Sequence, residues 1–328
     1  MPLLGDHGLN VSAHVLRDEI FSVSRRGVLS GYLPMKIWFA LLAAAAICRA
    51  ENLEQTYAPY GRLLITPFAS APFPHPSRAA GHQYKDKFFP AETHYCDNSV
   101  ALFIPKGFRE TPRVDVVVYF HGWGSSIEST LRRFQLIEQF TASGKNAVLV
   151  FPEGPKHASD SAGGKLEDPE GFKRFVNEVT ATLRRQAGGQ SSAEEIGRVI
   201  LAGHSGAYKV MAAILDRGGL PERVREVWLF DALYAETDKF LAWWDREQGR
   251  LLNIYTENGG TKRNSETWME RLKQRGTPFL FTSDTAVTAA ELKSGRLIFL
   301  STDLGHNDVV EKRKTFGEFL KTSCLDDR

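Results

Sequence analysis

The sequence predicts a single α/β domain with a mostly parallel central sheet and helices on both faces. Short β-branched runs alternate with longer amphipathic segments after about residue 94, and several of those runs are apolar nearly throughout. No internal repeat interrupts this alternation. With 328 residues, of which 42% are hydrophobic and 11% aromatic, the chain can bury a substantial core without metals or multiple disulfides.

Strands are expected where β-branched and apolar residues run together, because such residues pack well on a pleated, buried surface. These runs are Ser99–Ile104, Val114–Phe120, Ala147–Phe151, Val199–Ala202, Val227–Phe230, Leu251–Thr256 and Leu297–Ser301. The segments between them predict helices at Ile127–Thr141, Pro169–Arg185, Tyr208–Asp216, Thr237–Glu247, Ser265–Arg275 and Val309–Leu320. Ser125 and Glu128 have the spacing of a capping box before the first of these helices.

Residues 1–50 have the layout of an N-terminal extension with a cleaved signal peptide. Met35 to Ala50 reads MKIWFALLAAAAICRA, in which a lysine precedes an apolar stretch too short to span a bilayer comfortably. Small residues at Cys48 and Ala50 fit a cleavage site. A buried helix and a membrane anchor are the alternatives, but no second long apolar segment follows. We therefore expect an exported protein, periplasmic or secreted, without a stable membrane anchor after cleavage.

The start of the translated chain has two interpretations. Ser24–Leu29 reads SRRGVL, which is similar to a twin-arginine signal, but its arginines lie far from the apolar stretch. Translation from Met35 explains the signal peptide equally well.

After the signal peptide, composition divides the chain in two. Residues 51–93 are rich in Pro, Ala and aromatic residues without sustained periodicity, which predicts an irregular arm wrapped on the domain. Residues 94–328 contain all of the expected strands and helices and form the predicted α/β domain.

The charge balance bears on the choice of partner. Removing the five basic and three acidic residues of the first 50 from the 41 Lys and Arg and the 39 Asp and Glu leaves 36 of each. The mature chain is then formally neutral and has no dense basic cluster, which argues against nucleic acid as the main partner. The sequence shows no metal-ligand spacing and indicates no cofactor, and it leaves the oligomeric state open.

Two cysteines follow residue 50: Cys96 near the start of the α/β domain and Cys324 in the C-terminal tail. In an oxidising compartment, we expect a disulfide between them that ties the two ends together. Two unpaired thiols are the alternative.

The stretch Leu201–Val210 reads LAGHSGAYKV and places Ser205 between a strand and a helix. On a sharp strand-to-helix turn the backbone of a nucleophilic serine is strained and its hydroxyl projects from the sheet. The residues two before and two after it must be small, because strand and helix nearly touch there. Gly203 meets this requirement, and Ala207 departs by one methyl group from the second glycine of G-x-S-x-G. An incidental serine in a glycine-rich turn is the alternative.

Two further stretches lie at the ends of predicted strands: HGWGSS at His121–Ser126 and STDLGHNDVV at Ser301–Val310. Together with the turn at Ser205, they stand in the order found in the α/β-hydrolase superfamily. The sequence resembles that superfamily from about Ser99 to Leu320. The resemblance implies a serine hydrolase, esterase-like, whose nucleophile, acid and histidine follow one another along the chain.

The resemblance also implies the groups around the nucleophile. Backbone N–H groups of Trp123 and Gly206 match the oxyanion hole, which stabilises the negative oxygen of a tetrahedral intermediate. His306 matches the general base. An alcohol is a poor nucleophile at neutral pH, so the proton of Ser205 must pass to a group that titrates nearby, and imidazole is suited to this.

The acid has two candidates, because the superfamily allows a carboxylate after either strand between serine and histidine. Asp231 lies at the tip of one strand and Glu257 at the tip of the next. Asp231 is favoured because it directly ends an apolar strand, where burial beside the imidazole would hold the correct tautomer.

The connections suggest an open cleft. Only about one helix separates Asp231 from Leu251, which leaves no room for a lid domain and suits a bulky or polymeric acyl substrate. The polar loop Gly154–Gly171 leaves a parallel strand on the side of Ser205 and should overhang the site. Lys165 and Glu167 on this loop are candidates to contact a charged substrate, with a solvated loop as the alternative.

The sequence thus predicts an exported serine hydrolase that cleaves an ester or amide through an acyl-enzyme on Ser205, with a carboxylic ester as the favoured substrate. The same residues could pass the acyl group to an alcohol or amine, which would make an acyltransferase. A non-catalytic binding protein on this fold is a third reading, because fold does not imply function.

Overall fold

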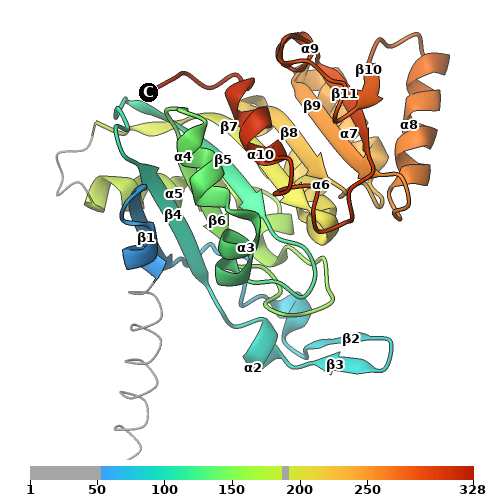
Figure 1. Ribbon diagram of the computed structural model, residues 1–328. Coiled ribbons are helices and arrows are strands. Elements are labelled where there is room, and N and C mark those ends of the chain that lie inside the picture. Colours follow the sequence, from blue (N-terminus) through green and yellow to red (C-terminus); the bar gives the residue numbers. More distant parts are fainter. Residues whose placement is uncertain (1–52, 187–191) are drawn as a thin grey trace, which may run out of the picture. The chain divides into compact units, whose positions relative to one another are not determined.

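A nine-stranded sheet forms the centre of the computed structural model, which describes residues 53–186 and 192–328 (Figure 1). The strand order is β1-β4-β6-β5-β7-β8-β9-β11-β10. Their bounds are β1 Gly61–Pro67, β4 Ser99–Pro105, β5 Arg113–Phe120, β6 Val148–Pro152, β7 Glu195–His204, β8 Val224–Phe230, β9 Arg250–Thr256, β10 Leu280–Ser283 and β11 Leu297–Thr302. The strands from β6 to β10 in this order are parallel, whereas β4 is antiparallel to both β6 and β1.

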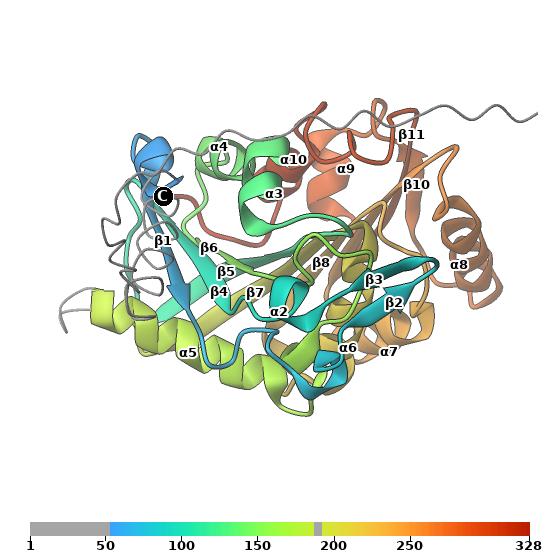
Figure 2. The ribbon, with the colours of Figure 1, turned by 90° about the horizontal axis from the view of Figure 1, so that it is seen from below.

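Helices cover both faces of the sheet, as Figure 2 shows. One face packs against α5 Gly171–Gln186, α6 Tyr208–Arg217, α7 Thr237–Glu247 and α8 Lys262–Gln274. The other packs against α3 Ile127–Phe134, α4 Leu136–Ala142, α9 Ala289–Ser294 and α10 Thr315–Lys321. The inner strands are buried on both faces, which explains their nearly continuous apolar sequences. The predicted α/β architecture is confirmed.

Helix boundaries differ from the prediction where the backbone turns left-handed. The expected helix Ile127–Thr141 is divided at Gln135, which has a φ of 48°. Phe134 and Leu136 would point about 200° apart on one continuous helix, yet both are buried, and the break lets both face the core. The capping box is formed by Ser126 and Ser129 rather than by Ser125 and Glu128. The last helix begins only at Thr315, after Lys314 with a φ of 52°.

The arm is more ordered than expected, which corrects the prediction of an irregular segment over residues 51–93. Gly61–Pro67 is the edge strand β1 and pairs along its whole length with β4. The strands β2 His82–Tyr84 and β3 Lys87–Phe89 then form a hairpin, followed by the short helix α2 Ala91–His94. The edge strand β10 and the helix α9 were likewise not predicted from the sequence. Edge strands face solvent on one side and lack the continuous apolar pattern that identifies an inner strand.

Residues 71–95 of the arm and 154–167 of the polar loop pack together, and we refer to them as the arm–loop wall. Phe73, Phe89 and Tyr95 from the arm share a small core with Ala158 and Ala162 from the loop. The two parts are also joined by charge, because the Arg78 guanidinium donates to both carboxylate oxygens of Asp160, at 2.6 and 3.0 Å. The loop backbone is held as well, since the Lys165 N–H donates to the carbonyl of Pro72 at 2.9 Å.

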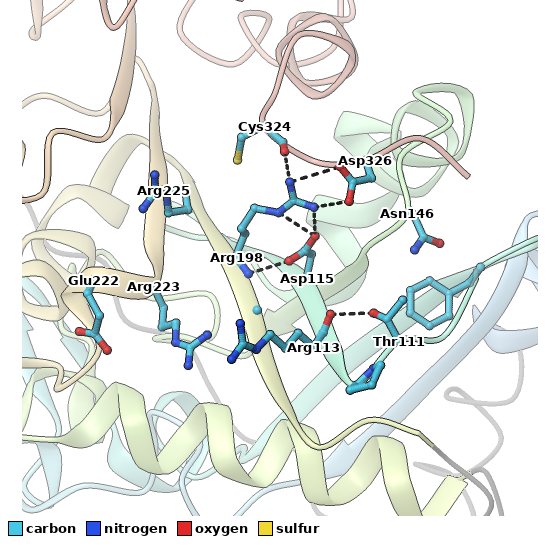
Figure 3. Close-up of a pocket in the computed structure, with 13 residues that line it drawn as sticks. Thr111, Arg113, Asp115, Asn146, Arg198, Glu222, Arg223, Arg225, Cys324 and Asp326 are labelled. Atoms are coloured by element: carbon cyan, nitrogen blue, oxygen red, sulfur yellow. Dashed lines mark hydrogen bonds and ion pairs between the residues drawn. The ribbon is translucent and has the colours of Figure 1, made fainter.

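The expected disulfide is absent, because Cys96 and Cys324 are both free. Cys96 precedes β4, whose start pairs with the carboxyl end of β6. Cys324 lines a cavity of about 780 Å³ at the amino ends of the parallel strands, where its carbonyl accepts a hydrogen bond from Arg198 (Figure 3). The two cysteines therefore lie at opposite ends of the parallel strands, Cys96 near the carboxyl ends and Cys324 at the amino ends. The C-terminal tail is anchored there by polar contacts instead, including an ion pair of 2.7 Å between Arg198 and Asp326.

No helix within residues 53–186 and 192–328 is long and apolar enough to cross a membrane. The predicted signal peptide, Met35 and the twin-arginine-like segment lie outside the described residues.

We expect the Arg78–Asp160 pair to stabilise the arm–loop wall strongly. Both side chains are largely buried, with 17% and 6% of their surface exposed, so Asp160→Ala leaves a buried cation without its partner. Breaking a buried pair in this way costs about 3–5 kcal/mol. Glu128→Ala, which removes an exposed pair with Arg132, is the matched control and should cost no more than about 1 kcal/mol. Equal losses in urea unfolding for the two variants would contradict a structural role for the buried pair.

Candidate functional site

Ser205 lies on a sharp turn at the carboxyl end of β7. The strand ends at His204, a single 3-10 turn covers Ser205–Ala207, and α6 begins at Tyr208. Ser205 has a φ of 56°, in the left-handed region that non-glycine residues rarely adopt. A Cβ atom on Gly203 would lie 2.5 Å from the Met211 sulfur and 2.6 Å from the Ala207 Cβ. The strand and helix do nearly touch, and Ala207 is accommodated because Gly203 faces it.

The end of β5 brings the His121–Ser126 segment against this turn. A Cβ atom on Gly122 would lie 2.7 Å from the Ser205 Cβ, so only glycine allows the approach. Gly206 lies directly against the Trp123 indole and Ser161, where even a methyl group would collide. Among the described hydrogen bonds, none uses the backbone N–H of Trp123, whereas its indole N–H donates to Ser161. The two proposed oxyanion donors therefore belong to segments in direct contact with Ser205.

His306 is hydrogen-bonded to Asp231. The distance from its Nδ1 to Asp231 Oδ2 is 2.5 Å. Asp231 directly follows β8 in the left-handed conformation, with a φ of 43°, and is fully buried. Its carboxylate also accepts hydrogen bonds from the Thr256 hydroxyl at 3.1 Å and from the Thr261 hydroxyl. A buried carboxylate needs such partners, because an unpaired charge is costly in the protein interior.

These partners keep Asp231 ionised. Burial by itself raises the pKa of a carboxyl group. Here the hydrogen bonds from His306 and Thr261, the positive charge of His306 and the Thr256 N–H outweigh burial and hold the pKa of Asp231 below its ordinary value. A charged carboxylate at Nδ1 fixes the proton on that nitrogen of His306 and leaves Nε2 as the basic atom.

The alternative acid, Glu257, does not contact His306. Its side chain is exposed, and its backbone N–H donates to the Thr302 carbonyl at 3.0 Å. The other nearby carboxylates have different partners: Asp303 pairs with Arg313 at 2.6 Å and Asp308 with Lys312 at 3.0 Å. Of the two candidates from the sequence, the structure joins only Asp231 to the imidazole.

Tyr234, which we did not predict from the sequence, lies beside both the serine and the histidine. Burial raises the pKa of its phenol and the Ser205 side chain opposes this shift, and its ring centroid lies 6.3 Å from that of His306. Among the described hydrogen bonds, none joins Ser205 directly to His306. Catalytic hydrogen bonds are often long without substrate and shorten in the complex. Tyr234 follows Asp231 by three residues, so its place beside the site depends on the same strand end.

His204, the last residue of β7, packs against His306. Its Nε2 lies 2.8 Å from the His306 carbonyl, so it must carry the proton that makes this hydrogen bond. The two imidazole rings are 4.5 Å apart between centroids, at an angle of 38°. Burial, and secondarily the positive charge of His306, lower the pKa of His204 to about 3. His204 therefore stays neutral beside the imidazole and fixes the backbone that carries it.

Lys165 and Glu167 have structural partners. The Lys165 ammonium donates to the Ala69 carbonyl at 2.8 Å, and Glu167 accepts from the Gly163 N–H at 2.6 Å. The loop reaches the site through Ser161 instead, whose hydroxyl accepts from the Trp123 indole N–H at 2.7 Å. These contacts give no support to the expectation that Lys165 and Glu167 bind a charged substrate.

His121 also has a structural environment. Its Nε2 lies 3.0 Å from both the Glu153 carboxylate and the Gly154 N–H, and the ring is buried. Glu153 in turn accepts from the Ile127 N–H at the start of α3, at 3.2 Å. This network holds the end of β5 to the start of the polar loop. In the part of the chain that is described, no three His, Cys, Asp or Glu residues are grouped so that they could hold a metal ion.

Neither the protein families nor the curated proteins compared with this chain include a match. Solved structures do match. The feruloyl esterase module from Clostridium thermocellum, in complex with sinapinate, is 11% identical with a TM-score of 0.50, over 80% of this chain and 88% of that one. A fluorophosphonate-binding serine hydrolase from Staphylococcus aureus is 10% identical with a TM-score of 0.46, over 80% and 99% of the two chains. At such low identity the likeness concerns the fold alone, and this chain has an α/β-hydrolase fold.

We expect His204 to make stability depend on pH. In the unfolded chain its pKa returns to about 6.5, whereas in the folded protein it is about 3. Between these values the unfolded state binds the extra proton, so the free energy of unfolding falls as the pH is lowered from about 6.5. His204→Gln should flatten this part of the profile in urea titrations. His157→Gln, which replaces an exposed histidine, is the matched control, and an unchanged slope in His204→Gln would refute the assignment.

Proposed function

We propose that this α/β-hydrolase-fold protein is a serine hydrolase that cleaves carboxylic esters through an acyl-enzyme on Ser205. One observation carries the proposal. Ser205, in its strained conformation, contacts the segments that carry the backbone N–H groups of Trp123 and Gly206. The imidazole of His306 is hydrogen-bonded to the buried, ionised carboxylate of Asp231. This is the arrangement that nucleophilic catalysis by an alcohol requires.

The first half of the reaction forms the acyl-enzyme. Ser205 Oγ attacks the ester carbonyl while Nε2 of His306 removes its proton. Asp231, bonded at Nδ1, stabilises the imidazolium that results. The carbonyl oxygen becomes negative and accepts hydrogen bonds from the backbone N–H groups of Trp123 and Gly206. When the intermediate collapses, the imidazolium gives its proton to the departing alcohol.

The second half returns the enzyme to its starting state. Water takes the place of the alcohol, gives a proton to His306 and attacks the acyl carbon of the ester on Ser205. The tetrahedral intermediate is held by the same two N–H groups. Its collapse releases the carboxylic acid, and the proton on His306 returns to Ser205.

Tyr234 and His204 have supporting places in this scheme. The Tyr234 phenol interacts with the Ser205 side chain and borders the position of the hydroxyl before substrate arrives. His204 keeps the His306 backbone in place without adding a positive charge, which would oppose formation of the imidazolium.

The connections support a bulky or polymeric ester as the substrate. Between β8 and β9 the chain forms only α7, so no lid domain is inserted there. Ester cleavage is also the activity named for the Clostridium thermocellum module, which has the same fold. We further propose that the protein acts outside the cytoplasm, on the basis of the signal-like residues Met35–Ala50.

Two alternatives use the same fold. An acyltransferase would share the acyl-enzyme and deliver it to an alcohol or amine instead of water. A non-catalytic binding protein would have no need of a strained serine or of a buried carboxylate bonded to His306. These costly features favour an enzyme.

Ser205→Ala tests the nucleophile. We expect it to lower the turnover of short-chain aryl esters by about 10⁴-fold or more, because no other hydroxyl lies on the turn. The same change should abolish covalent labelling by a fluorophosphonate. Ser294→Ala, in α9 away from the site, is the matched control and should keep both activity and label. A folded wild-type protein that neither labels nor hydrolyses esters would exclude the proposal.

Asp231→Asn and Glu257→Gln separate the two candidate acids. Asp231→Asn removes the charge that orients His306, and turnover should fall by about 10⁴-fold. Glu257→Gln changes an exposed side chain and should alter turnover less than about threefold. Both variants are compared by steady-state kinetics after their folding is verified by circular dichroism. The opposite ranking would assign the role to Glu257.

A further inference from the structure

Two exposed aromatic side chains flank the nucleophile. In the described part of the chain, four large hydrophobic side chains are exposed: Phe88 at 53%, Trp123 at 43%, Tyr234 at 37% and Phe281 at 53%. Trp123 packs against Gly206, and the Tyr234 ring lies 6.3 Å from that of His306 between centroids, where its phenol also interacts with the Ser205 side chain. Exposed apolar surface that gathers at one place marks a binding surface more often than scattered exposure does.

The sheet topology places these two rings on opposite sides of Ser205. Trp123 follows β5, Ser205 follows β7 and Tyr234 follows β8. In the sheet β7 lies between β5 and β8, and all three strands run parallel. Their carboxyl ends therefore present tryptophan, serine and tyrosine in that spatial order.

The Trp123 ring is fixed by the arm–loop wall. The ring of Tyr84, from β2, meets it edge to face at a centroid distance of 4.8 Å and an angle of 71°. Its indole N–H donates to the Ser161 hydroxyl at 2.7 Å. Figure 2 shows the β2–β3 hairpin lying across the carboxyl-end edge of the sheet. The indole is thus held in place from both parts of the wall while 43% of the residue stays exposed.

The backbone that carries Tyr234 is held by α8. Asn264, from this helix, donates to the carbonyls of both Leu233 and Tyr234, at 3.1 and 2.5 Å. The ring of Tyr208, at the start of α6, lies 6.1 Å from the Tyr234 ring between centroids. A ring on a backbone held in this way needs less ordering when a ligand binds, so less of the interaction energy is lost to entropy.

We propose that the substrate is an ester with a planar aromatic ring close to the scissile bond, received between Trp123 and Tyr234. This inference rests on the proposed esterase function and specifies its substrate class. Aromatic pairs in offset or edge-to-face contact gain about 0.5–1.5 kcal/mol beyond area burial, which a linear alkyl chain cannot match. The ring can belong to the acyl group or to the alcohol, and the experiment distinguishes the two.

The test compares matched esters by kcat/KM in the full-length mature protein. Methyl 3-phenylpropanoate against methyl octanoate tests a ring in the acyl group, and benzyl acetate against hexyl acetate tests a ring in the alcohol. We expect the wild type to prefer the ring-bearing member of at least one pair by about 2- to 10-fold. The preferred pair identifies the position of the ring.

Variants of Tyr234 separate the ring from the hydroxyl. Tyr234→Leu should lower kcat/KM for the preferred aryl ester by about 2- to 10-fold more than for its alkyl partner, and this difference should appear mainly in KM. Tyr234→Phe should retain the aryl preference. Phe281→Leu, which replaces a more exposed ring on the edge strand β10, is the matched control and should change neither ester. If Tyr234→Leu does not fold, the aryl-to-alkyl ratio of Trp123→Leu provides the same comparison.

The outcomes separate this inference from the function on which it rests. Hydrolysis of all esters without an aryl preference, or with equal losses in Tyr234→Leu for aryl and alkyl partners, would overturn the inference and leave the esterase intact. A marked preference for acetylated sugars over both aryl esters would likewise overturn it. Absence of both hydrolysis and fluorophosphonate labelling would overturn the esterase itself.

Discussion

The approach of three chain segments at Ser205 is the constraint on which the rest of the structure depends. The end of β5, the end of β7 and the first turn of α6 meet so closely that Gly122 and Gly203 have no room for a Cβ atom. A serine in the left-handed conformation is tolerable there because the flanking strand is buried and paired on both sides. The inner strands therefore hold the turn as well as filling the core, and a looser sheet would let the serine relax.

A second requirement follows from placing an ionised carboxylate at the end of β8. Asp231 has no exposed surface, so every interaction that keeps it charged must come from the protein. The hydroxyls of Thr256 and Thr261 provide part of this; Thr256 is the last residue of β9, the next strand in the sheet, and Thr261 follows that strand. Two neighbouring strand ends thus build the environment of one side chain. The same principle explains why His204 is uncharged, because burial disfavours its charged form and a second positive charge beside His306 would add repulsion.

Much of this arrangement could be predicted from the sequence, and the reasons for success and failure are physical. Inner parallel strands such as β5 and β8 have apolar runs that few other structures produce, and the turn at Ser205 is defined by small residues at fixed offsets. The edge strands β1 and β10 lack such a signal because one side is solvated. The predicted disulfide was wrong because the positions of cysteines in the sequence do not show at which end of the strands each one lies. Tyr234 and His204 were missed because nothing local marks an aromatic or imidazole ring whose partner is a hundred residues away or belongs to a neighbouring strand.

The positions of the site residues along the sequence determine when the site can form during synthesis. One part of the arm–loop wall precedes every strand of the sheet except β1, the nucleophile lies two thirds of the way along the chain, and the histidine is close to the C-terminus. A fragment that lacks either end of the domain therefore lacks part of the candidate site. A nascent polypeptide has Ser205 without His306 until the last strand has left the ribosome and docked, so the proposed reactivity toward esters would arise late in biosynthesis, at the completion of the fold.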